Sequence, residues 1–195
     1  MDLLTIGTQR SDRITMINDI SWSEYEKILQ QVDNDFPGRI SYLDGTLAIM
    51  SSDRSHEMPK KLIGMLLEEY LCQFDLDFYA LGSETFKKPP AGKEPDQSYC
   101  FGTKKDYPDL AIEIVVSSEG INDLAIYAIL NVPEVWFYQS NKINIYSLID
   151  DNHQLVESSL ILSQLNIAFI EKYMLRTDSF NRIIRDFRHE LNLEQ

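Results

Sequence analysis

One segment decides the fold class: residues 108–116 have the sequence PDLAIEIVV. From Leu110 onward the segment is almost continuously apolar, which is typical of a β-strand that is buried on both faces. Glu113 interrupts this run at its centre. Because burying a carboxylate is costly unless it is paired or holds a cation, Glu113 is the most informative acid of the chain. The segment therefore predicts a central strand with a candidate functional carboxylate.

The segments on either side predict a mixed sheet flanked by helices. Strands are expected at residues 77–81, 98–101, 134–138 and 143–148, and helices at residues 58–74, 121–131 and 179–191. Since strands alternate with helices through the middle of the chain, we expect an α+β (α/β) protein with one mixed β-sheet.

The N-terminal part predicts an irregular arm at residues 1–18, followed by a helix that Ser21 or Ser23 can cap. Two alternating runs on either side of Asp44-Gly45 then predict a β-hairpin. Residues 87–92 predict a turn or loop. We expect a single domain over residues 1–195. Its core is expected at residues 20–150, and a C-terminal extension with an amphipathic helix at residues 151–195.

Composition limits the function and the compartment. The 195 residues include 18 Lys+Arg and 31 Asp+Glu, a formal net charge of −13, which argues against a broad basic surface for nucleic acid. The sequence shows no signal peptide and no apolar run of about 18 residues, so we expect no membrane partner. Cys72 and Cys100 lie outside any metal-ligand spacing, which favours free thiols in a reducing cytoplasm.

Two more acids lie close to Glu113 in the predicted sheet. Asp96 precedes the neighbouring strand and comes beside Glu113 if the two strands pair, and oxygen ligands on adjacent strands suit Mg²⁺ or Mn²⁺. Asp109 faces the same way as Glu113 but lies about 13 Å away along the strand. Structural alternatives stay open for each acid. If they bind no metal, Asp109 and Asp96 are expected to be turn residues, and Glu113 is expected to pair with a buried hydroxyl or a basic side chain.

Four blocks of the sequence resemble a known family. They are EPDxSY at residues 94–99, PDLAIE at 108–113, GIxxLxIY at 120–127 and VPEVWF at 132–137. This pattern resembles a bacterial family described as putative restriction endonucleases, within the PD-(D/E)XK nuclease superfamily. The resemblance covers about residues 20–150. It implies a restriction endonuclease-like core and a Mg²⁺ (or Mn²⁺) site made by acids on adjacent strands.

The resemblance assigns roles to individual residues. Asp96 matches the acid of the second strand, Glu113 the acid of the third, and Asp109 the Pro-Asp pair of the family. In such enzymes the acids hold a metal ion that activates water and stabilises the phosphoryl transition state. His56 is a candidate ligand or proton shuttle. The acid on the long helix stays open between Glu57, Glu68 and Glu69.

One position departs from the family pattern. The usual Glu-x-Lys is absent because residue 115 is Val115. In the family that this chain resembles, the lysine looks displaced onto the next helix, four residues before a tyrosine. Here that position is Asp123, before Tyr127. A nuclease needs a cation near its water or phosphate, so catalysis is expected to be impaired. The metal ion then has to offset the developing charge alone, unless a lysine from another segment reaches the site: Lys87, Lys88, Lys104 or Lys105. If the site is otherwise intact, Asp123→Lys is expected to create or increase activity.

Three functions follow. The first is a metal-dependent DNA endonuclease, with a homodimer expected because duplex cleavage needs two cuts. The alternative is a catalytically degenerate nuclease-fold protein that acts as a binding or regulatory module. A third class is a metal-dependent hydrolase of another substrate. The C-terminal arginines Arg182, Arg185 and Arg188 form the basic surface that the sequence offers to phosphate.

Overall fold

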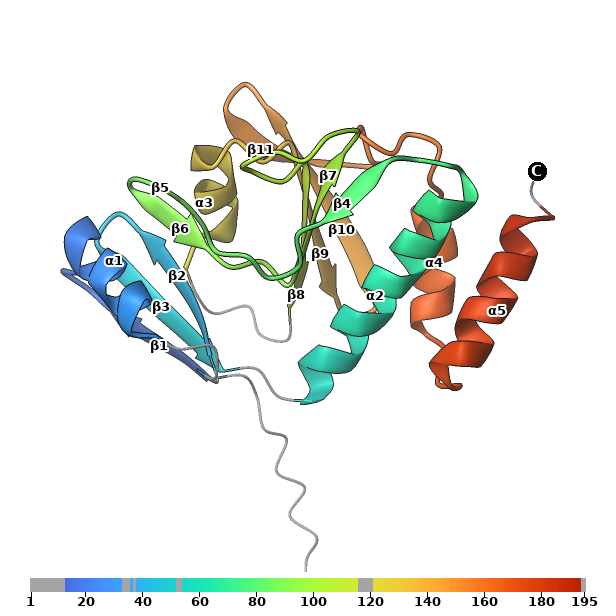
Figure 1. Ribbon diagram of the computed structural model, residues 1–195, viewed down its shortest axis with the longest axis horizontal. Coiled ribbons are helices and arrows are strands. Elements are labelled where there is room, and N and C mark those ends of the chain that lie inside the picture. Colours follow the sequence, from blue (N-terminus) through green and yellow to red (C-terminus); the bar gives the residue numbers. More distant parts are fainter. Residues whose placement is uncertain (1–12, 33–35, 37, 52–53, 116–120, 194–195) are drawn as a thin grey trace, which may run out of the picture.

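A computed structural model describes residues 13–32, 36, 38–51, 54–115 and 121–193. The α+β class with a mixed sheet and flanking helices is confirmed (Figure 1). One detail differs: the strands form two sheets, where the sequence predicts one. Residues 1–12 of the predicted arm, Val116 and Gly120 lie outside the described residues.

The larger sheet, here called the central sheet, is mixed. Its strand order is β11 (Asn152–Val156), β10 (Lys142–Ile149), β9 (Glu134–Gln139), β8 (Leu110–Ile114), β7 (Gln97–Phe101) and β4 (Phe78–Ala80). The apolar run of residues 110–114 forms β8, which pairs with β7 antiparallel and with β9 parallel. Helix α3 (Asp123–Ile129) makes the connection that a parallel pair requires. Strand β8 is buried along its whole length, as predicted.

The second sheet, here called the N-terminal sheet, is antiparallel. Its order is β1 (Arg13–Ile17), β3 (Thr46–Ser51), β2 (Arg39–Leu43), β6 (Ala91–Lys93) and β5 (Phe86–Lys88). The predicted hairpin is β2–β3. Asp44 and Gly45 both have positive φ angles, 42° and 90°, as a tight hairpin turn demands. Residues 13–17 form a strand instead of the predicted irregular arm, because β1 finds an antiparallel partner in β3.

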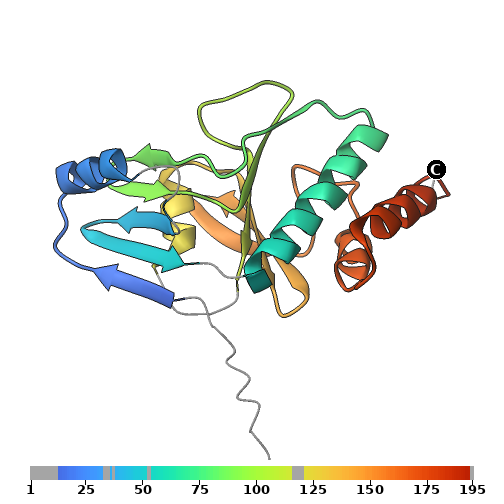
Figure 2. The same cartoon turned by 60° about the horizontal axis from the view of Figure 1, so that its bottom comes forward.

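Helix α1 (Trp22–Gln31) lies against the N-terminal sheet, while the long helix α2 (Arg54–Gln73) and helices α4 (Ile167–Met174) and α5 (Phe180–Leu191) lie toward the other end of the molecule (Figures 1 and 2). Ser21 is the cap of α1: its hydroxyl accepts from Glu24 N and the Glu24 carboxylate accepts from Ser21 N. In the described part of the chain, no helix combines the length and apolarity needed to cross a membrane.

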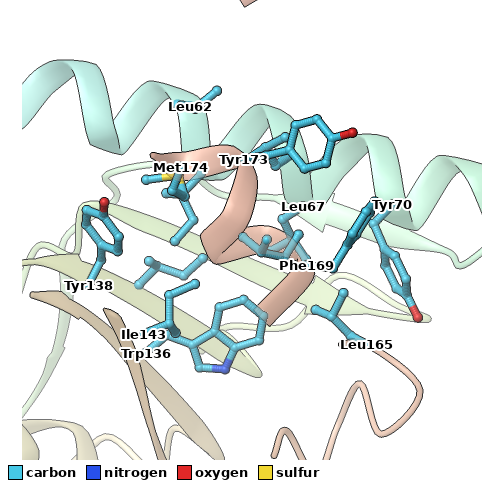
Figure 3. Packing of buried hydrophobic residues seen from close by; sticks show 14 of the residues in the cluster. Leu62, Leu67, Tyr70, Trp136, Tyr138, Ile143, Leu165, Phe169, Tyr173 and Met174 are labelled. Carbon is cyan, nitrogen blue, oxygen red and sulfur yellow. The ribbon is translucent and has the colours of Figure 1, made fainter. Parts of the chain in front are cut away.

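The main hydrophobic core lies between the central sheet and the helices α2, α4 and α5. Figure 3 shows the part of this core between the sheet, α2 and α4. Trp136 on β9 is fully buried there, and Phe169 of α4 stacks on Phe187 of α5 with ring centroids 4.9 Å apart. The sequence does not predict α4 or β11, although both belong to this part of the fold. The opposite face of the central sheet is covered by α3 and by side chains of β5 and β6. The central sheet is therefore enclosed on both faces, and the N-terminal sheet meets it on the α3 side.

Gly92 on β6 is required by the packing of α1. A Cβ atom at this position would overlap the hydroxyl of the buried Tyr25 and come within 2.6 Å of its Cζ. Tyr25 cannot move aside easily, because its ring stacks on Tyr42 with centroids 4.7 Å apart. We expect Gly92→Ala to lower the free energy of unfolding by about 1–3 kcal/mol, as overpacking of a core does. Urea denaturation measures this loss.

A variant background supplies the control for this prediction. Leucine at residue 25 lacks the ring atoms that the new methyl group would meet. In a Tyr25→Leu background, the additional cost of Gly92→Ala is expected to be much smaller. Equal costs in both backgrounds would contradict the steric explanation.

Candidate functional site

Asp96 and Glu113, the two acids predicted to lie beside each other, do so where the two sheets meet. Asp96 immediately precedes β7, Glu113 lies in β8, and the register pairs Gln97 with Ile112, so that the next positions, 96 and 113, lie opposite each other. Directly opposed residues of antiparallel strands point to the same face, with Cβ atoms about 4.5–5.5 Å apart. Asp96 is fully buried and Glu113 is 4% exposed. Their burial demands partners of opposite charge.

Polar groups from three elements surround the Asp96 carboxylate. The Arg39 guanidinium, at the start of β2, forms an ion pair with Asp96 Oδ1. His56 Nε2, near the start of α2, lies 3.1 Å from Oδ2, and the backbone N–H of Ile114 donates to the same oxygen at 2.7 Å. Burial, followed by the nearby Arg39 charge, lowers the pKa of His56 to about 4. His56 is therefore neutral at neutral pH, and the formal countercharge of Asp96 is Arg39.

Glu113 is held by a lysine and a tyrosine. Lys93 Nζ lies 3.2 Å from Glu113 Oε1, and the hydroxyl of Tyr127 on α3 donates a short hydrogen bond to the same oxygen. Among the residues that the structure describes, none forms a hydrogen bond with Oε2. Burial raises the pKa of Glu113, and the Lys93 charge opposes that rise. The alternative noted from sequence, a Glu113 paired with a hydroxyl and a base, is thus present.

Lys93 connects Glu113 to the residue that departs from the family pattern. Its ammonium lies 2.7 Å from Asp123 Oδ1, at the first residue of α3. Lys93 is only 5% exposed. Burial opposes the charged form, but the carboxylates of Asp123 and Glu113 outweigh it and raise the pKa of Lys93. The ammonium therefore stays charged between two acids.

Further charged side chains surround this centre. Arg39 lies 3.7 Å from Glu57 and 3.9 Å from Glu94, and Lys60 on α2 donates to the hydroxyl of Ser83 at 3.1 Å. We call the whole set the inter-sheet charge cluster. Its members are Arg39, His56, Glu57, Lys60, Lys93, Glu94, Asp96, Glu113 and Asp123. With His56 neutral, five carboxylates against three permanent cations leave two formal negative charges among these described residues.

Asp109 does not lie with Asp96 and Glu113. It stands before the other end of β8, where its carboxylate accepts from Phe101 N at 2.8 Å and pairs with Lys105 at 2.6 Å. Four residues of strand separate it from Glu113, about 13 Å. Its side chain therefore closes the β7–β8 connection, which is the structural alternative that the sequence left open.

The structure also separates the three candidate acids of α2. Glu57 lies beside Arg39 and the imidazole of His56, at the cluster. Glu68 accepts from the Tyr99 hydroxyl at 3.1 Å, and Glu69 pairs with Arg188 at 2.5 Å. Only Glu57 of the three has contacts within the cluster in the described structure.

The cations of the cluster are the residues that sequence reasoning misses. Of the lysines proposed to compensate, Lys87 pairs with Glu26 and Lys105 with Asp109. Of the C-terminal arginines, Arg185 pairs with Asp186 and Arg188 with Glu69. Arg39 and Lys93 carry one detectable signal. Each is a basic residue at the end of a short strand, and Lys93 lies three residues before Asp96.

A groove borders the cluster on the side of α1. It has a volume of about 520 Å³, and its lining includes Glu26, Ser83, Lys87 and Glu94. Ser83 and Glu94 connect the groove to the cluster, through the bond from Lys60 and the contact with Arg39. Because its two acids outnumber its one lysine, the groove is not a basic channel of the kind that tracks nucleic acid.

A mixed sheet enclosed by helices, with acids on adjacent strands and buried cations beside them, defines a protein with a restriction endonuclease-like fold. The chain belongs to the Uma2 family, whose model, described as putative restriction endonuclease, matches residues 22–171. Among solved structures, it is similar to a putative nuclease from Anabaena variabilis. The two share 12% sequence identity with a TM-score of 0.52, over 75% of this chain and 97% of the other. No match is found among the curated proteins.

Proposed function

We propose that this protein is a metal-dependent DNA endonuclease, with Asp96 and Glu113 as the metal-binding acids. The observation that carries the proposal is the opposed placement of these two buried carboxylates on adjacent strands, surrounded by Arg39, His56 and Lys93. Family membership supports a nuclease. Asp109 has no part in the proposal, because its carboxylate is engaged at the other end of β8.

The donor set fits Mg²⁺ or Mn²⁺. Both prefer oxygen ligands, and Mg²⁺ keeps several waters, so that one or two carboxylates are enough to bind it. In the described residues, no group of three or more His, Cys, Asp or Glu side chains is placed so that it could hold a metal ion, so an ion here would have two carboxylates and water as its ligands. The excess of two negative charges in the inter-sheet charge cluster matches one divalent cation. The site is therefore suited to an ion that is bound partly by water.

Arg39 and His56 are the residues proposed to act beside the metal ion. A bound divalent ion would lower the pKa of a water molecule and neutralise charge on the phosphate. Arg39 presents a planar guanidinium, the group best suited to bind phosphate oxygens, and would exchange its contact with Asp96 for the substrate. His56, neutral and beside Asp96, is able to accept a proton from water. Duplex cleavage further favours a homodimer.

A catalytically degenerate binding module is the second candidate, and two observations favour it. Arg39 and Lys93 already neutralise both acids, so a metal ion has to displace or share their contacts. The net charge of −13 also opposes tight binding to DNA.

Plasmid cleavage and calorimetry on the wild-type protein separate these candidates. We expect nicking or linearisation of supercoiled DNA with Mg²⁺ or Mn²⁺, no cleavage with a chelator, and Mn²⁺ binding with about one ion per chain. Binding of Mn²⁺ without cleavage would favour the degenerate module. Absence of both would exclude the proposed metal site.

A further inference from the structure

The cation beside Glu113 comes from a different element than the family pattern implies. The position where the resembling family carries its lysine holds Asp123, at the first residue of α3. Lys93, from the end of β6, places its ammonium 2.7 Å from Asp123 Oδ1 and 3.2 Å from Glu113 Oε1. The positive charge is thus present at the site, although it comes from a different element of the fold.

We propose that Lys93 is the active-site cation of this protein and that Asp123 is its positioning residue. The inference rests on the proposed nuclease function. In this role the Lys93 ammonium stabilises the negative charge that develops on the attacking water and the phosphate. The Asp123 carboxylate fixes the direction of the lysine side chain toward Glu113.

The packing supports a fixed position for this ammonium. Lys93 is 5% exposed, and its strand is paired with both β2 and β5. A flexible lysine loses side-chain entropy when it is ordered, and that cost is not recovered at an exposed ion pair. Here the ammonium is buried between two carboxylates, where an electrostatic contact is much stronger than in water. Asp123 is itself well placed, because a helix N-terminus favours a negative charge.

The other lysines near the site are less suited to this role. Lys87 is half-exposed and pairs with Glu26, and Lys105 pairs with Asp109 at the opposite end of β8. Lys60 donates to the Ser83 hydroxyl. Lys93 is the lysine that the described structure places against Glu113.

This arrangement reverses the expectation drawn from sequence for Asp123→Lys. A lysine at position 123 would meet the Lys93 ammonium instead of an empty position. Like charges at this distance in a buried site repel each other strongly. We therefore expect Asp123→Lys alone to impair the site, and the exchange to work only when Lys93 is replaced as well.

A charge-exchange experiment tests the proposal, with Lys93→Met, Asp123→Lys, the double variant, and Lys87→Met as a surface control. Each is measured by plasmid cleavage, Mn²⁺ calorimetry and thermal unfolding. Lys93→Met is expected to lower kcat at least about 100-fold with little change in KM, as loss of one preorganised electrostatic group does. Because a neighbouring cation is removed, its Mn²⁺ affinity rises. Asp123→Lys is expected to lose both cleavage and Mn²⁺ affinity, and the double variant to regain most of the cleavage.

The outcomes separate this inference from the proposed function. If the wild type cleaves DNA, equal cleavage by Lys93→Met, or a double variant no better than Asp123→Lys, would overturn the role of Lys93. If the wild type binds Mn²⁺ without cleaving, the nuclease function fails. A rise in Mn²⁺ affinity in Lys93→Met then still supports a Lys93 ammonium at the metal site, and an unchanged affinity overturns it. A wild type without cleavage or Mn²⁺ binding overturns both proposals.

Discussion

Replacing Glu113 by glutamine is expected to reduce metal-dependent cleavage at least about 10³-fold, since a metal ion contributes several kcal/mol to the transition state and each 1.36 kcal/mol corresponds to about tenfold in rate. Glutamine keeps the size of the side chain and can still accept the Tyr127 hydrogen bond. What it lacks is the negative charge that a divalent cation requires. Lys93 retains its Asp123 partner, so the fold should persist.

The matched control for Glu113→Gln is Asp109→Asn, on the same strand segment. Asp109 binds Phe101 N and Lys105 and has no contact with the inter-sheet charge cluster in the described structure. This variant is expected to lose some stability and to keep the cleavage activity and the Mn²⁺ affinity. Circular dichroism and plasmid cleavage of the two variants measure the contrast. Activity that survives in Glu113→Gln and disappears in Asp109→Asn would contradict the proposal and place the metal site at the Asp109 end of β8.

The sheet around β8 could be predicted because its signals are local. The apolar run of residues 110–114 predicts a doubly buried strand, and the alternation around Asp44-Gly45 predicts a hairpin. Strand β11 follows a less recognisable turn, Asp150-Asp151, in which both residues adopt positive φ angles of 49° and 61°. Its side chains are mostly polar and exposed, so periodicity gives no sign of the strand. What defines β11 is its pairing with β10, which is a tertiary contact.

The acids of the site could be predicted and its cations could not. Asp96 and Glu113 stand out because each interrupts or adjoins an apolar strand, where a carboxylate needs an explanation. Arg39 and Lys93 lie at the ends of short strands, where a basic residue is ordinary on any solvent-exposed edge. Their burial depends on the second sheet, which covers this face of the central sheet. Because the sequence predicts only one sheet, it also predicts that Arg39 and Lys93 are exposed to solvent.

The net charge of −13 has a different meaning once the contacts are known. The acids that the structure describes within residues 106–141 do not form one patch: Glu134 is fully buried and accepts hydrogen bonds from Trp136, Ser147 and the Leu160 backbone. Asp109 and Asp123 each face a lysine from outside that stretch. Lysines of other segments thus pair with part of this stretch, so the sequence overstates the repulsion at the site.

Removing the Asp96 carboxylate is expected to have the largest effect on stability. Asp96 is fully buried, and it is the partner of Arg39, whose side chain is 9% exposed. In Asp96→Ala the guanidinium would remain in the interior with only the more distant Glu57 and Glu94 as acids. Breaking a buried ion pair in this way costs about 3–5 kcal/mol in the free energy of unfolding. The Ile114 N–H would also lose its acceptor, which adds to the loss.

A double-mutant cycle tests whether the cost comes from the stranded charge. Arg39→Met keeps an apolar side chain of similar length in the same place, and leaves Asp96 with His56 and the Ile114 N–H. If the unpaired guanidinium dominates, Arg39→Met/Asp96→Ala is expected to be more stable than Asp96→Ala, because nothing charged then remains buried at this position. Urea unfolding of the four proteins gives the coupling free energy. A loss below about 1 kcal/mol in Asp96→Ala, the size of an exposed ion pair, would mean that solvent reaches Arg39 and that the pair is not a buried one.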